Sequence, residues 1–127
     1  MTEYTAVSSL TGLYLEDSFV LQLLEEPNTV KFRLEAVLTA AHPLYRDPKP
    51  GERYCYAEGW LVFAGASRIE WVRRSEQQYI DASGDGDLGN IDYLKQENDH
   101  WLVGGDWGEM RIFSQVVPEL FLEQGGI

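Results

Sequence analysis

The sequence predicts an all-β fold: an antiparallel sandwich or partly open barrel of about eight short strands, with at most one or two short helices. Three observations support this prediction. Apolar and polar residues alternate over several segments, turn-forming residues recur about every ten positions, and no stretch of twelve or more residues carries a 3.6-residue period. Such spacing is typical of antiparallel sheets.

The first two predicted strands form a hairpin around Pro27 and Asn28. Apolar side chains occupy odd positions from 13 to 23 and even positions from 30 to 38, which is the period of a strand with one buried face. Asp17 falls on the apolar side of the first strand. We therefore expect either a β-bulge that turns it outwards or a buried carboxylate with a partner.

A long loop is predicted over residues 39–53, which contain three prolines and Gly51. Prolines at this density cannot continue a helix or a central strand. A loop of this length is either functional or a stiffened crossover. Short helices remain alternatives at residues 34–42, which are rich in alanine, and at residues 73–81.

The remaining strands are predicted on both sides of an acidic, glycine-rich segment. Residues 54–65 and 67–74 are rich in aromatic and β-branched residues and are separated by a short turn. Beyond residue 90, further strands are expected, with breaks at residues 97–99, at Gly104–Gly105 and at Pro118.

Length and charge restrict the function. The chain has 127 residues, of which 44% are hydrophobic, so we expect a single domain over residues 1–127. Its formal net charge is −11. An acidic surface repels nucleic acids and anionic lipid headgroups but attracts basic proteins and divalent cations. The oligomeric state does not follow from these data.

The sequence points to the cytoplasm. Cys55 is the single cysteine, so no disulfide can form within the chain. The first residues lack the basic region of a signal peptide, and no apolar run approaches 18 residues. We expect a soluble cytoplasmic protein.

The segment DASGDGDLGNID, residues 81–92, follows the spacing of a calcium-binding EF-hand loop. The calcium ligands would be Asp81, Ser83, Asp85, Asp87 and Asp92. The helices that normally flank such a loop are not predicted here, and a closing aspartate is shorter than the usual glutamate. The alternative is a hairpin or compact loop whose glycines adopt positive φ.

Acidic residues concentrate in the last third of the chain. Positions 81–109 carry a net charge of −7, whereas positions 46–74 carry +2. On one exposed surface these acids would attract a basic protein, and aromatic residues among them are typical of binding hot spots. The candidate protein-binding residues are Asp85, Asp87, Asp92, Tyr93, Trp101, Asp106 and Trp107. Alternatively, the charges pair across neighbouring strands and the aromatic residues belong to the core.

Residues suited to catalysis are few. Cys55 lies in a predicted strand and is expected to be a buried apolar residue, and His42 precedes a proline and is expected to cap a turn. No nucleophile and base stand at a recognisable spacing. We therefore predict that the protein is not an enzyme.

Four segments carry a resemblance to known proteins: LYLEDSFVLQL, HPLYRDPKPGERYCY, DGDLGNIDYL and GGDWGEMRI. With them the chain resembles a group of small, uncharacterised, single-domain bacterial proteins. In size, charge and class it is also similar to immunity proteins that neutralise bacterial toxins. This resemblance implies a non-enzymatic, acidic interaction module that binds a basic partner, with a calcium-binding β-domain as the alternative.

Overall fold

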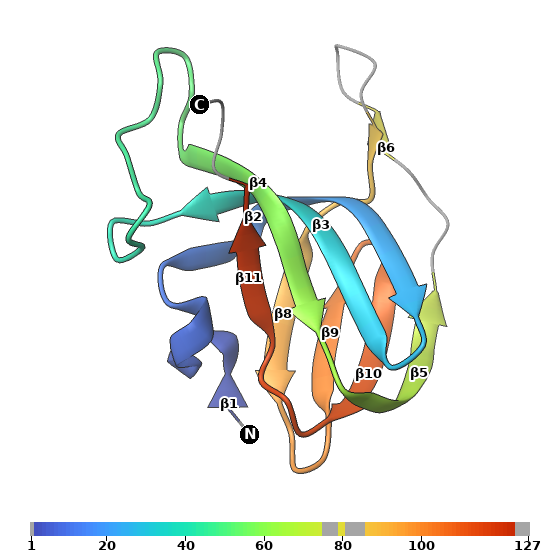
Figure 1. The fold of residues 1–127 in the computed structure, drawn as a ribbon. Coiled ribbons are helices and arrows are strands. Elements are labelled where there is room, and N and C mark those ends of the chain that lie inside the picture. Colours follow the sequence, from blue (N-terminus) through green and yellow to red (C-terminus); the bar gives the residue numbers. More distant parts are fainter. Residues whose placement is uncertain (1, 75–78, 81–85, 124–127) are drawn as a thin grey trace.

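The computed structural model describes residues 2–74, 79–80 and 86–123 (Figure 1). In these ranges the protein is all-β, as predicted, and its helical elements are two short 3₁₀ turns, η1 (Tyr4–Ala6) and η2 (Ser8–Leu10). No helix in the described part of the chain is long and apolar enough to cross a membrane.

Two antiparallel sheets contain nine strands, close to the expected eight. Sheet A has the order β1 (Thr2–Glu3), β8 (Ile91–Gln96), β9 (Trp101–Gly105), β10 (Gly108–Ser114) and β5 (Ala66–Arg74). Sheet B has the order β11 (Glu119–Leu122), β4 (Cys55–Phe63), β3 (Thr29–Leu38) and β2 (Leu13–Glu26). A separate ribbon pairs β6 (Tyr79–Ile80) with β7 (Gly86–Asp87).

The core lies between the sheets, which Figure 1 shows stacked on each other. It is built by the apolar positions that alternate along each strand. Phe32 and Phe63 of sheet B pack edge to face at 5.9 Å, and Phe63 meets Trp101 of sheet A at 6.4 Å. Aromatic pairs at these separations stabilise a core beyond the area they bury.

A bulge interrupts the predicted alternation of β2. Tyr14 pairs with Val37, but the pairing resumes only at Phe19, so the odd positions that face the core before the bulge give way to Ser18 and Val20 after it. A second register shift between Val20 and Gln22 returns Leu23 to the core side. Ser18 is fully buried in the bulge: its hydroxyl donates to the Tyr14 carbonyl at 2.6 Å and accepts the Val37 amide at 2.9 Å. The side chain thus replaces the missing backbone bonds.

Asp17 points away from the core, so the bulge is the correct one of the two predicted alternatives. Its carboxylate accepts a hydrogen bond of 2.6 Å from the Tyr54 hydroxyl, at the end of the proline-rich segment. Residues 39–53 form no strand or helix, as predicted, and Tyr54 also lies before the strand, which begins at Cys55.

The bulge also brings β2 to sheet A. The Val20 amide donates to the Gly89 carbonyl and the Leu88 amide donates to the Val20 carbonyl, each at 2.8 Å. The Asn90 side chain donates to the Glu16 carbonyl at 2.7 Å. β2 therefore joins the two sheets along one side, which makes the sandwich a partly closed barrel.

One predicted break is wrong. Gly104 and Gly105 lie inside β9, and the turn falls at Asp106–Trp107. Glycine is required at both positions because neighbouring groups occupy the space of a side chain. A Cβ on Gly104 would overlap the Tyr93 ring, and a Cβ on Gly105 would overlap the Asn90 carbonyl.

Candidate functional site

Two of the predicted protein-binding aromatics are core residues. Trp101 and Trp107 are each 1% exposed, and Trp107 packs against Phe32 at 5.1 Å and Trp71 at 6.0 Å. The expectation that they lie on the surface is wrong, because Trp101 on β9 and Trp107 in the turn after it both direct their rings into the core. They cannot contact a partner directly.

Asp92 and Asp106 lie close enough for their charges to interact, and Glu16, which is far away in the sequence, joins them. Asp92 is exposed on β8, and partial burial followed by the charges of Asp106 and Glu16 raises its pKa. Arg73 opposes this shift. The Asp106 carboxylate also lies 3.5 Å from the Asn90 amide, so this small acidic group sits where β2 meets sheet A.

Tyr93 and Glu109 are paired within sheet A. The Tyr93 ring crosses Gly104, and its hydroxyl donates to the Glu109 carboxylate, whose cross-strand partner is Arg73. Burial and then this hydrogen bond raise the pKa of Tyr93 to about 12. The register places Arg73 opposite Glu109, while the Arg73 guanidinium donates to the Gly105 carbonyl at 3.2 Å.

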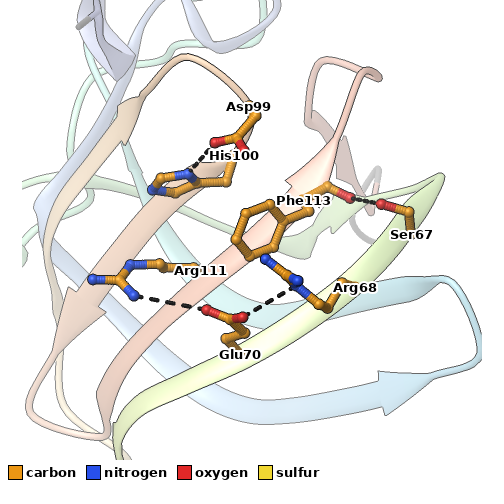
Figure 2. A network of polar contacts seen from close by, with 7 residues as sticks. All are labelled: Ser67, Arg68, Glu70, Asp99, His100, Arg111 and Phe113. Atoms are coloured by element: carbon orange, nitrogen blue, oxygen red, sulfur yellow. Dashed lines mark hydrogen bonds and ion pairs between the residues drawn. The ribbon is translucent and has the colours of Figure 1, made fainter.

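The rest of the outer face of sheet A is also mixed in charge (Figure 2). Glu70 pairs with Arg68 at 3.1 Å and with Arg111 at 3.7 Å. The Phe113 ring lies between the Arg68 guanidinium, 4.1 Å from its centre, and the His100 ring at 5.0 Å. This face is therefore not the acidic surface that positions 81–109 suggest.

An open pocket of about 300 Å³ borders this network. Its lining residues are Gly65, Ser67, Asp99, Phe113, Ser114, Gln115 and Val116. The Asp99 carboxylate forms a hydrogen bond of 2.8 Å with Nδ1 of His100. The Ser67 hydroxyl donates to the Phe113 carbonyl at 3.2 Å. The Ser67 hydroxyl is directed at a backbone carbonyl and not at the His100 ring (Figure 2).

The predicted calcium ligands are only partly placed. Asp81, Ser83 and Asp85 lie outside the described residues, and Asp87 is described only as backbone paired with Tyr79 in the β6–β7 hairpin. Asp92 belongs to a strand, not to the helix that follows an EF-hand loop. Within the described ranges, no three His, Cys, Asp or Glu side chains form a metal-binding group.

A different surface gathers aromatic residues, on the outer side of sheet B. Tyr54 meets Tyr14 at 6.3 Å and Tyr56 at 6.1 Å, both edge to face. The register places Val37 between Tyr14 and Tyr56, and Val37 is 1% exposed although it is outside the main core. The tyrosines therefore form a small second cluster over this end of the sheet.

The next outward positions extend this cluster along the sheet. Trp60 follows Tyr56 and Glu58 on β4, and its cross-strand partners are Arg33 on β3 and Phe121 on β11. The Arg33 guanidinium lies 5.3 Å from the centre of the Trp60 ring, and Phe121 is 54% exposed. We call this surface the aromatic face; it comprises Tyr14, Tyr54, Tyr56, Trp60 and Phe121.

Carboxylates outnumber cations around the aromatic face. Eight acids and five bases lie on the outward rows of sheet B and the adjoining loop. The acids are Asp17, Glu26, Glu35, Asp47, Glu52, Glu58, Glu119 and Glu123, and the bases are Lys31, Arg33, Arg46, Lys49 and Arg53. Burial raises the pKa of Tyr56, and Glu35, Asp17 and Glu52 raise it further. Arg53 opposes this shift, Lys31 pairs with Glu26, and Arg33 pairs with both Glu58 and Glu123, so the excess of acids is partly neutralised within the face.

Comparison with known proteins gives no relative: no family model matches the chain, and neither a curated protein nor a solved structure is significantly similar to it.

Sequence reasoning missed the aromatic face although part of its signal was present. Side chains alternate between the two faces of β4. Leu61 and Phe63 are buried on the inner face, which assigns Tyr56, Glu58 and Trp60 to the outer face. The remaining members come from β2, β11 and the proline-rich segment, and their approach depends on strand order.

His42 and Cys55 take the roles that were expected. The Leu44 amide donates to the His42 ring at 3.0 Å, which closes a local turn, and burial lowers the pKa of His42. Cys55 is 2% exposed at the start of β4.

Proposed function

We propose that the protein is a non-enzymatic interaction module that binds a basic protein partner through the aromatic face of sheet B. The observation that carries this proposal is the row in which Phe121, Trp60 and Arg33 lie side by side on three strands, with Phe121 54% exposed. Tyrosine, tryptophan, phenylalanine and arginine are the residues enriched in protein interfaces.

Charge supports a basic partner. The eight carboxylates around the aromatic face exceed the five cations, and the whole chain carries −11. Complementary charge accelerates association and excludes acidic partners, while aromatic anchors contribute most of the affinity. This is the chemistry of an inhibitor or immunity protein that covers the cationic surface of its target.

The location differs from the one expected from the sequence. Asp92, Tyr93 and Asp106 lie on or beside sheet A, where Arg73 is close to them. The aromatic face of sheet B combines exposed aromatic side chains with an excess of carboxylates, so we assign the proposed contact to that face.

The test is affinity capture of a partner from the native host with three forms of the chain. The double variant Trp60→Ala/Phe121→Ala should lose about thirtyfold or more in affinity, because truncating an interface hot spot costs about 2 kcal/mol or more. Val72→Ala is the matched control, because Val72 is 46% exposed but belongs to sheet A. Its affinity should equal that of the wild type.

Ionic strength gives the second measurement. Raising the salt concentration should slow association of the captured partner, because screening weakens attraction between separated charges. A partner that binds the double variant as tightly as the wild type, or whose association rate ignores salt, would contradict the proposal.

A further inference from the structure

β11 is an edge strand with half of its hydrogen-bonding groups facing outward. It pairs with β4 on one side and ends the order of sheet B, beside the N-terminal segment in Figure 1. The Glu123 amide donates to the Glu58 carbonyl at 2.8 Å. Because antiparallel ladders alternate, Glu119 and Phe121 also direct their backbone groups at β4, whereas Leu120 and Leu122 direct theirs at the free edge.

The N-terminal segment lies against part of this edge, where η2 packs beside β11. The Ser9 hydroxyl donates to the Pro118 carbonyl at 2.6 Å, just before β11 begins. Leu120 and Leu122 pack their side chains against the core, so the strand is held in place from within. An ordered edge with outward backbone groups is a template for another strand.

The outward side chains of β11 and of the residue after it determine which strand fits. They are Glu119, Phe121 and Glu123, an aromatic residue between two acids, of which Glu123 already forms an ion pair of 2.7 Å with Arg33 but keeps 58% of its side chain exposed. In a second copy paired antiparallel through Leu120 and Leu122, Glu119 would lie opposite Glu123 twice. Directly opposed like charges destabilise a sheet, so this edge is unsuited to self-association.

We propose that an extended basic segment of the partner adds to β11 as a fifth strand of sheet B, with cationic side chains opposite Glu119 and Glu123 and an apolar one opposite Phe121. This inference rests on the proposed function and specifies how the partner engages the aromatic face. The added strand would continue the row formed by Arg33, Trp60 and Phe121.

A synthetic peptide tests the inference directly. The probe is acetyl-Thr-Lys-Thr-Val-Thr-Lys-Thr-amide, and its control has glutamate in place of both lysines. Amide hydrogen exchange of the full chain, followed by NMR, should slow about tenfold or more at Leu120 and Leu122 when the lysine peptide saturates the chain. The glutamate peptide should leave both amides unchanged.

A pair of variants separates the backbone contact from packing. Leu122→Pro and Leu122→Ala both shorten the buried side chain, but only proline removes the outward amide. The lysine peptide should bind the proline variant about threefold to tenfold more weakly than the alanine variant, which is the usual contribution of one hydrogen bond.

The outcomes distinguish this inference from the proposed function. If the lysine peptide shifts the Trp60 indole resonance but leaves the Leu120 and Leu122 amides unprotected, strand addition is wrong and docking on the aromatic face stands. If the lysine peptide does not bind at millimolar concentration, or the glutamate peptide binds equally well, the inference is overturned. The proposed function would instead be overturned if the captured partner bound the Trp60→Ala/Phe121→Ala variant as tightly as the wild type.

Discussion

The ring of Tyr93 lies across Gly104 on the neighbouring strand, in the space where any other residue would place its Cβ. Gly104→Ala should therefore displace the ring from Glu109 and lower the free energy of unfolding by about 1–3 kcal/mol, the usual cost of overpacking. Urea unfolding measures this change. In a Tyr93→Ala background the same substitution should cost far less. Equal costs in both backgrounds would show that the contact with Tyr93 is not the cause.

Ser18 should be among the most sensitive polar positions in the chain. Ser18→Ala removes the partner of the buried Val37 amide and of the Tyr14 carbonyl, so the free energy of unfolding should fall by about 1–3 kcal/mol. Ser67→Ala is the control, since its hydroxyl is exposed and should change stability by no more than about 0.5 kcal/mol. A Ser18→Ala protein as stable as the control would refute the role of this hydroxyl in the bulge.

The charge of Asp92 should make the protein less stable as the pH rises. Partial burial and the charges of Asp106 and Glu16 raise the pKa of Asp92 in the folded state. At pH values between the ordinary and the raised pKa, the native state therefore binds more protons than the unfolded state. Stability is lost as the pH rises through this window. Asp92→Asn should thus raise the melting temperature at pH 7, and the gain should disappear below the ordinary aspartate pKa.

Asp99 provides a control of opposite sign. Its hydrogen bond to His100 lowers its pKa, so its charged form contributes stability above the ordinary aspartate pKa, and that contribution is lost as the pH falls through the lowered value. Asp99→Asn should lower the melting temperature at pH 7. If both substitutions shift it in the same direction, the assigned electrostatic causes are wrong.

Calcium tests the alternative interpretation of residues 81–92. Strands β5 and β8 stand where an EF-hand has helices, and no three potential ligand side chains form a group among the residues that the structure describes. We therefore expect millimolar calcium to leave the melting temperature unchanged. A rise that follows calcium occupancy and is abolished by Asp81→Ala would establish the calcium site instead.

The fold class could be predicted because the signal is local. The hairpin of residues 13–38 follows from alternation and from the turn at Asn28, whose φ is +62°. The reversal of faces at Ser18 could only be suspected from the position of Asp17, since a bulge depends on the partner strand. The turn after β9 was misplaced because Gly104 and Gly105 serve close contacts, which the sequence does not distinguish from a break.

The candidate site depends on distances between strands that are far apart in sequence. Phe121 reaches Trp60 only because β11 pairs with β4, and Arg73 reaches Glu109 only because β5 pairs with β10. Charge density along the chain therefore indicated an acidic protein but not which of its faces is acidic. The assignments of cytoplasmic location, basic partner and lack of catalysis remain predictions.

The double membership of β2 has a mechanical consequence. Because this strand is paired with β3 on either side of its bulge and bonded to residues 88–90 through Val20, one sheet could slide past the other only by breaking these hydrogen bonds. We therefore expect β2 to resist shear between the two sheets.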